Sequence, residues 1–103
     1  EQSKKLGLRA PMVGHLGDGN FHVILPYDPK EEGTYEKIRD FSDLLIKKTL
    51  ELNGTITGEH GVGLHKKSYL LQEHGDSIPL MRTIKKSIDQ NNIMNPGKIF
   101  DLN

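Results

Sequence analysis

The sequence predicts an α+β domain in which helices pack on one face of an antiparallel sheet. Three observations support this class: a glycine-rich turn between two apolar segments, a long amphipathic stretch after it, and an expected element order of β-β-α-β-α-α. The 103 residues form one domain at most, with 14 basic and 14 acidic side chains and no cysteine. The equal numbers of basic and acidic side chains argue against a nucleic-acid surface. Because the chain has no cysteine, any metal must be held by His, Asp, Glu or backbone oxygen.

The N-terminal quarter predicts a helix end followed by a β-hairpin. The opening EQSKKLGL is typical of the last turn of a helix that ends near Gly7, as expected for a piece of a longer polypeptide. Residues 10–16 and 20–27 predict two strands joined at Asp18-Gly19. This residue pair favours a two-residue type I′ turn.

A long amphipathic helix is expected after the hairpin. It begins at the Asp28-Pro29 cap or, because Gly33 weakens that start, at Thr34. Its apolar stripe consists of Tyr35, Ile38, Phe41, Leu45 and Leu52, with Leu44 beside it. Asn53-Gly54 is a favourable stop signal for this helix.

The C-terminal half predicts one strand and two helices. Residues 54–58 are β-branched and bounded by glycines, which predicts a buried strand. A glycine-rich loop then leads into a short helix that ends at Gly75, and a last helix covers about residues 77–90. The inward face of this last helix is expected to contain Leu80, Met81, Ile84 and Ile88.

The predicted hairpin places two histidines together. With a two-residue turn, His22 faces His15 and Phe21 faces Leu16, and directly opposed residues have Cβ atoms about 5 Å apart on one face. Two such imidazoles can bind one metal ion at about 2.0–2.1 Å from each nitrogen. The alternative is a pair of solvated histidines. The apolar pair on the other face favours a histidine face that is free to line a cleft.

The segment GTITGEHGVG offers a third ligand in Glu59 or His60. In an extended backbone these neighbours point to opposite faces, so one of them can reach the metal while the other faces elsewhere. Two histidines with one carboxylate leave coordination positions open, whereas a structural zinc site is closed by four protein ligands. The glycines serve tight turns or a phosphate nest, but their order is not that of a P-loop or dinucleotide motif.

Three motifs together resemble a known family. GHLGDGNFH, GTITGEHGVGLHK and IMNPGKIF, in this order over residues 14–100, are similar to the C-terminal part of FAD-linked oxidases of the vanillyl-alcohol-oxidase type, in the branch of D-lactate dehydrogenases and glycolate oxidase subunits. The resemblance implies that residues 1–103 are the C-terminal portion of the ferredoxin-like α+β cap domain. The FAD-binding N-terminal domain is then absent from this chain, as is the earlier half of the cap.

The resemblance also implies roles for individual residues. His15, His22 and Glu59 become ligands of a divalent metal, zinc or manganese. His60 becomes the base that takes the substrate hydroxyl proton, and Asn95 lies near the flavin. The FAD itself is expected to be bound mainly by the missing domain.

The implied reaction is oxidation of a small D-2-hydroxy acid, D-lactate or glycolate, to the 2-oxo acid. Relatives that oxidise D-2-hydroxyglutarate tend to have an asparagine where this chain has Ile24, which favours a smaller acid. In this reaction a Lewis acid lowers the barrier to alkoxide formation by several kcal/mol. An imidazole, which titrates near neutrality, is suited to accept the hydroxyl proton. The flavin accepts the hydride. The alternative is a non-catalytic metal-binding or partner-docking fragment, and the 103 residues alone are expected to be inactive.

The resemblance sets the expected partners and location. The partners are the 2-hydroxy acid substrate and the FAD-binding domain of the same polypeptide or of a partner subunit, with no nucleic acid. Membrane association is expected only at the periphery, through an electron acceptor, because the longest apolar runs fall far short of the roughly 20 residues of a membrane span. The expected location is cytoplasmic, or mitochondrial in a eukaryote.

Overall fold

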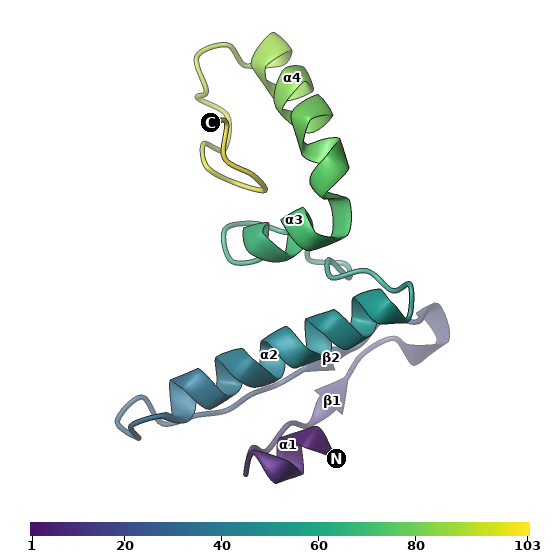
Figure 1. The fold of residues 1–103 in the computed structure, drawn as a ribbon, viewed down its shortest axis with the longest axis vertical. Coiled ribbons are helices and arrows are strands. Elements are labelled where there is room, and N and C mark those ends of the chain that lie inside the picture. Colours follow the sequence, from purple (N-terminus) through teal and green to yellow (C-terminus); the bar gives the residue numbers. More distant parts are fainter. The chain divides into compact units, whose positions relative to one another are not determined.

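A computed structural model describes all residues, 1–103, in two compact units, Glu1–Asn53 and Gly54–Asn103. Figure 1 shows the ribbon, with the elements α1 (Gln2–Lys5), β1 (Met12–Val13), η1 (Leu16–Asp18), β2 (His22–Val23), α2 (Thr34–Glu51), α3 (Lys67–His74), η2 (Gly75–Ser77) and α4 (Ile78–Ile88). The helices accompany one small antiparallel sheet of two strands. The predicted α+β class is therefore confirmed.

The first unit opens with the short helix α1, which ends where the sequence predicts. Gly7 has φ 70°, a left-handed conformation that glycine adopts at little cost. The chain turns back there because the Leu8 amide donates to the Ser3 carbonyl at 2.8 Å and the Gly7 amide donates to the Lys4 carbonyl at 3.1 Å. The predicted helix end near Gly7 is confirmed.

The hairpin forms, but its register differs from the prediction. Met12 pairs with Val23, and Val13 pairs with His22. The amides of Asp18 and Asn20 both donate to the His15 carbonyl, at 2.9 and 3.1 Å. The connection is therefore longer than the expected two-residue turn: it contains the 3₁₀ turn η1 and a left-handed Gly19 with φ 72°.

The new register corrects the predicted histidine pair. His22 faces Val13 rather than His15, and His15 lies at the start of η1. The expected apolar pair of Leu16 and Phe21 is also wrong, since Leu16 lies in the turn with 76% of its surface exposed. Gly14 explains part of this geometry, because the Phe21 Cα would lie only 2.6 Å from a Cβ at that position.

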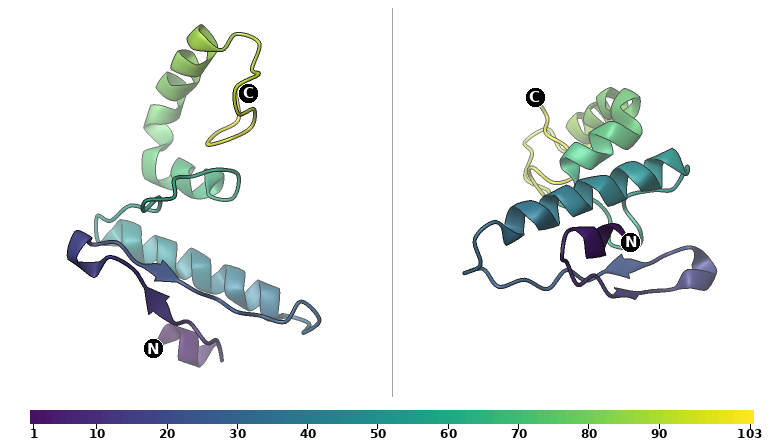
Figure 2. Two further views of the ribbon diagram at one scale, coloured as in Figure 1. Left: turned by 180° about the vertical axis from the view of Figure 1, so that it is seen from behind. Right: turned by 60° about the horizontal axis from the view of Figure 1, so that its bottom comes forward.

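The helix α2 confirms the predicted long amphipathic helix, and it begins at the second of the two predicted starts. It begins at Thr34, after a left-handed Gly33, whereas Asp28 instead closes a turn by accepting the Lys30 amide at 2.9 Å. Phe41, in the predicted apolar stripe, is buried. Both views in Figure 2 show the hairpin segment running beside α2 within this unit.

Residues 54–58, at the start of the second unit, do not form the predicted strand. Ile56 is buried as expected, with 5% of its surface exposed. Its main chain is bound by side chains instead of a neighbouring strand: the amide donates to Glu73 Oε2 at 3.1 Å, and the carbonyl accepts from Lys66 Nζ at 2.9 Å. These contacts meet the hydrogen-bonding demand that a strand would meet through pairing.

The second unit continues as α3, η2 and α4, with the C-terminal tail returning beside α4 (Figure 1). Leu70 and Ile78 are its buried helix positions. The expected inward face of α4 is wrong for Leu80, Ile84 and Ile88, which are 63%, 51% and 74% exposed. Three residues of the expected face, Met81, Ile84 and Ile88, instead line an open apolar groove of about 350 Å³, together with Lys85, Asp89, Met94 and Phe100.

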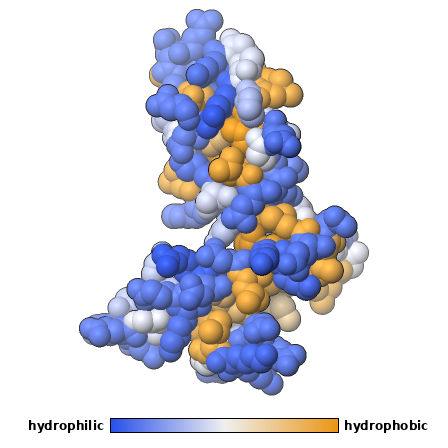
Figure 3. All heavy atoms as spheres, in the orientation of Figure 1, coloured by the Kyte–Doolittle hydropathy of each residue, from blue (hydrophilic) through white to orange (hydrophobic).

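Apolar atoms remain at the surface of the molecule, as Figure 3 shows. The tail adds Ile93 and Met94, 76% and 60% exposed, to the exposed stripe of α4. None of the helices combines the length and apolar character required to cross a bilayer.

Candidate functional site

The glycine loop brings Glu59 and His60 together. The chain turns at residues 58–60, and Gly61 closes this turn by donating its amide to the Thr57 carbonyl at 3.2 Å. Gly58 and Gly61 have φ 50° and 73°, conformations that favour glycine. His60 Nε2 lies 3.5 Å from Glu59 Oε1. The prediction that these side chains diverge is wrong, because it assumed an extended backbone.

This proximity has a chemical consequence. The side chains of Glu59 and His60 are 49% and 71% exposed, so both are accessible to a small molecule or an ion. A carboxylate beside an imidazole restricts the orientation of the ring, which suits a histidine that accepts a proton. The same oxygen and nitrogen donors also suit a divalent transition metal.

The glycine loop is anchored at both ends by more distant residues. At its entry, Lys66 and Glu73 bind the carbonyl and amide of Ile56. At its exit, the Gly63 carbonyl accepts from the Ile99 amide at 2.8 Å. These anchors were not predicted from the sequence. Their seven-residue spacing, which puts Lys66 and Glu73 on one helical face, was the available signal for the first pair.

The two hairpin histidines belong to the first unit. His22 is half-buried in β2, whereas His15 is exposed and contributes its carbonyl to the turn hydrogen bonds. Imidazole nitrogens, together with a carboxylate such as that of Glu59, form a donor set appropriate for zinc or manganese. The residues thus fit a metal by their chemistry, and their joint coordination of one ion stays a prediction.

Asn95 lies in a tight turn of the tail. It has φ 48°, its carbonyl accepts the Lys98 amide at 3.3 Å, and Gly97 follows with φ 71°. The Asn95 residue is exposed, so its amide group can meet a ligand. Its predicted contact with the flavin stays a prediction.

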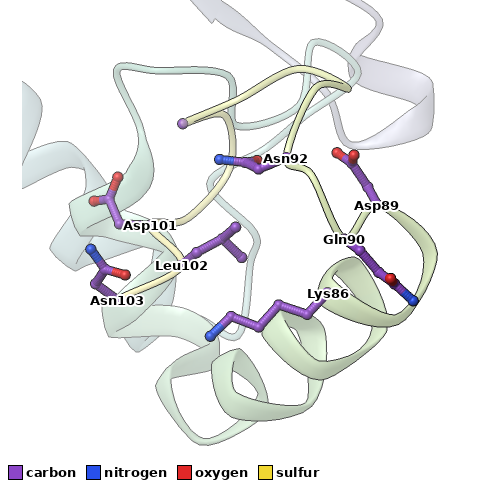
Figure 4. A pocket seen from close by; sticks show the side chains of 8 residues that line it. Lys86, Asp89, Gln90, Asn92, Asp101, Leu102 and Asn103 are labelled. Atoms are coloured by element: carbon purple, nitrogen blue, oxygen red, sulfur yellow. The ribbon is translucent and has the colours of Figure 1, made fainter.

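A separate polar pocket of about 530 Å³ lies where α4 meets the tail (Figure 4). It contains none of the predicted site residues; its lining is Lys86, Asp89, Gln90, Asn92, Gly97, Asp101, Leu102 and Asn103. Buried Asp89 binds the Lys85 ammonium group and accepts the amides of Ile93 and Met94, each at 2.9 Å. The Lys85 hydrogen bond, followed by these amide bonds, lowers the pKa of Asp89 to about 2. This arrangement fixes the tail.

The three sequence motifs around residues 14–22, 54–66 and 93–100, the second of which contains the glycine loop, lie within one protein family. The sequence model of the family described as FAD linked oxidases, C-terminal domain, matches residues 1–99, and the chain belongs to this family. The match covers both units and every predicted site residue.

Individual relatives make the similarity more specific. The chain is 41% identical to a probable mitochondrial D-lactate dehydrogenase of Danio rerio over 92% of its length. It is 50% identical to the mitochondrial D-lactate dehydrogenase (cytochrome) 1 of Saccharomyces cerevisiae over 86% of its length, and 41% identical to the glycolate oxidase subunit GlcD of Bacillus subtilis over 84%. The aligned region is only 15–19% of these relatives, so the chain spans less than a fifth of their length.

Proposed function

We propose that this chain is the C-terminal portion of the cap domain of a flavin-dependent oxidoreductase that oxidises a small D-2-hydroxy acid, D-lactate or glycolate, to the 2-oxo acid. Family membership and the names of the relatives support the reaction class. The observation that carries the proposal is the glycine turn that holds the His60 imidazole 3.5 Å from the Glu59 carboxylate. In this proposal, the flavin domain belongs to the same polypeptide, and the 103 residues alone are inactive.

In the proposed site, the His60 imidazole accepts the hydroxyl proton of the substrate. His15, His22 and Glu59 would hold a zinc or manganese ion, which would supply Lewis-acid chemistry at the substrate oxygen. FAD supplies the redox chemistry when bound, with Asn95 near it. Because His60 is adjacent to a ligand, the loop serves both binding and proton transfer.

The names of the relatives also support a location. Two of them are described as mitochondrial D-lactate dehydrogenases. We propose a mitochondrial location if the chain is eukaryotic and a cytoplasmic one otherwise, with peripheral contact to a membrane electron acceptor. Fractionation of the native protein, followed by a salt wash of the membranes, tests this placement.

The decisive experiment separates Glu59 from His60 in the protein that includes the flavin domain. Glu59→Gln keeps the size of the side chain but removes its charge, so bound metal should decrease and excess metal should restore part of the activity. His60→Asn retains all three proposed ligands, so the metal content should hold while kcat falls by about 10²–10⁴-fold, the usual contribution of a positioned general base. Metal analysis and steady-state kinetics measure both quantities.

His65→Asn is the matched control, because His65 is an exposed histidine a few residues along the same chain. It should change neither metal content nor kcat. His15→Asn and His22→Asn should reduce the metal content as Glu59→Gln does. Loss of metal in His60→Asn with retention in Glu59→Gln would reverse the two roles. Small effects from both would instead support the non-catalytic, metal-binding or partner-docking alternative.

A further inference from the structure

Ile99 adopts a backbone conformation that its side chain disfavours. Four residues other than glycine have positive φ, and three of them are asparagines, which tolerate the left-handed region. The fourth is Ile99, with φ 70°. A β-branched residue in this region is a genuine outlier and carries conformational strain.

The strain belongs to a specific turn. The Phe100 amide donates to the Lys98 carbonyl at 2.8 Å, so residues 98–100 form a γ-turn with Ile99 at its centre. A γ-turn with positive φ at the central residue is the rare and strained form. In this turn, the Ile99 amide donates to the Gly63 carbonyl at 2.8 Å.

Neighbouring contacts hold the strained turn in place. The Asp101 carboxylate accepts from Lys67 Nζ at 2.6 Å, and its carbonyl accepts from Arg82 Nε at 2.6 Å. Upstream, Asp89 fixes the tail by accepting the Ile93 and Met94 amides. Strained conformations persist where surrounding contacts over-determine them, and they are concentrated at functional sites.

We infer that Ile99 is a positioning residue, whose strained backbone directs its N–H to the Gly63 carbonyl and thereby fixes the exit of the loop that carries His60. Gly63 is three residues after His60, and its own φ is 56°. A loop rich in left-handed glycines has many accessible conformations, so an anchor at its exit limits where the imidazole can lie. This inference rests on the proposed function, because it assigns the anchored loop to proton transfer.

The test removes the amide hydrogen of Ile99; the same ester linkage also makes the Lys98 carbonyl a weaker acceptor for the Phe100 amide within the turn. In the full protein with its flavin domain, Ile99 is replaced by its α-hydroxy acid analogue, so that an ester oxygen takes the place of N–H. We expect faster hydrogen exchange in peptides that cover residues 61–64. We also expect kcat to fall by about 10- to 100-fold at unchanged KM, as for a catalytic group displaced by about 1 Å.

Ile99→Asn is the matched variant, because it keeps the N–H and favours the left-handed conformation. It should retain the loop exchange and kcat of the parent protein. The inference is overturned if the ester variant exchanges and turns over like the parent, or if Ile99→Asn is equally impaired. Faster exchange without a change in kcat overturns the positioning role as well. The proposed function fails by a different result, an unchanged kcat in His60→Asn.

Discussion

The hairpin and the glycine loop are held in place by different kinds of hydrogen bonds. In the hairpin, main-chain groups bind one another, as in the turn around His15 and in the bond from the Ile24 amide to the Pro11 carbonyl at 2.9 Å. In the loop, residues 10 and 17 positions away bind the main chain of Ile56 through their side chains. The loop exit depends on a still more distant amide, that of Ile99.

This difference shows what each region requires from the sequence. The hairpin depends on which residues permit a close backbone approach, so its glycines determine its geometry. The glycine loop instead depends on individual side chains elsewhere in the unit, and conservative changes at those positions should move it. We therefore expect different substitutions to disrupt the hairpin and the glycine loop.

The largest effect is expected from Gly14→Ala in the hairpin. A Cβ at this position would lie 2.6 Å from the Phe21 Cα and 2.7 Å from the Asn20 carbonyl oxygen, and φ is 154°. Both contacts are with backbone, which cannot move aside without opening the hairpin. We expect a loss of about 2–4 kcal/mol in the free energy of unfolding, from overpacking and backbone strain together. Urea denaturation of the whole protein measures it.

Gly17→Ala is the matched control in the same hairpin. Nothing lies within 4 Å of a Cβ at Gly17, and its φ is not in the positive range. This variant should be as stable as the parent protein, within the roughly 0.5 kcal/mol typical of surface substitutions. Equal stabilities of the two variants would show that the close approach at Gly14 does not determine the hairpin.

A smaller effect is expected from Glu73→Ala, which removes one loop anchor. The Glu73 side chain is 11% exposed, and its loss leaves the amide of Ile56 without this partner. Leaving a buried donor unsatisfied costs about 1–3 kcal/mol. Hydrogen exchange should increase at residues 55–63 and stay unchanged in the hairpin. As a control, Glu51→Ala breaks the exposed pair with Lys48, which should contribute no more than about 1 kcal/mol.

The sequence predicted the regular helices well and the hairpin only in part. The helix α2 was predictable because its period of apolar residues and its glycine start are local signals. The hairpin register was not, because Asp18-Gly19 favours a two-residue turn and the competing 3₁₀ turn over residues 16–18 has no equally strong signal. The prediction of a strand at residues 54–58 was also wrong, because a β-branched run favours burial of Ile56 but does not supply a pairing partner.

The candidate site was predictable as a set of residue types but not as a geometry. The motifs identified Glu59 and His60, whereas their convergence follows from the turn conformations of the surrounding glycines. The anchors Lys66 and Ile99 were missed for a physical reason. A solvated lysine and one that binds a buried carbonyl look alike in sequence, and a strained isoleucine violates its own propensity.

Acid should weaken the tail anchor while leaving the hairpin ladder intact. Main-chain groups do not titrate in the acid range, but Asp89 holds the tail through its charged carboxylate. Its pKa is lowered from 3.8 to about 2, chiefly by the Lys85 hydrogen bond. A depressed folded-state pKa means that the stabilisation is complete above about pH 5, where the unfolded-state carboxyl is also ionised, and is lost as the pH falls toward 2. Asp89→Asn should therefore be less stable than the parent protein at neutral pH, and this difference should shrink between pH 5 and pH 3. Denaturation at several pH values measures the difference, and hydrogen exchange at residues 92–94 shows whether the loss is local to the tail. A stability difference that does not change with pH would mean that the Asp89 charge is not what holds the tail.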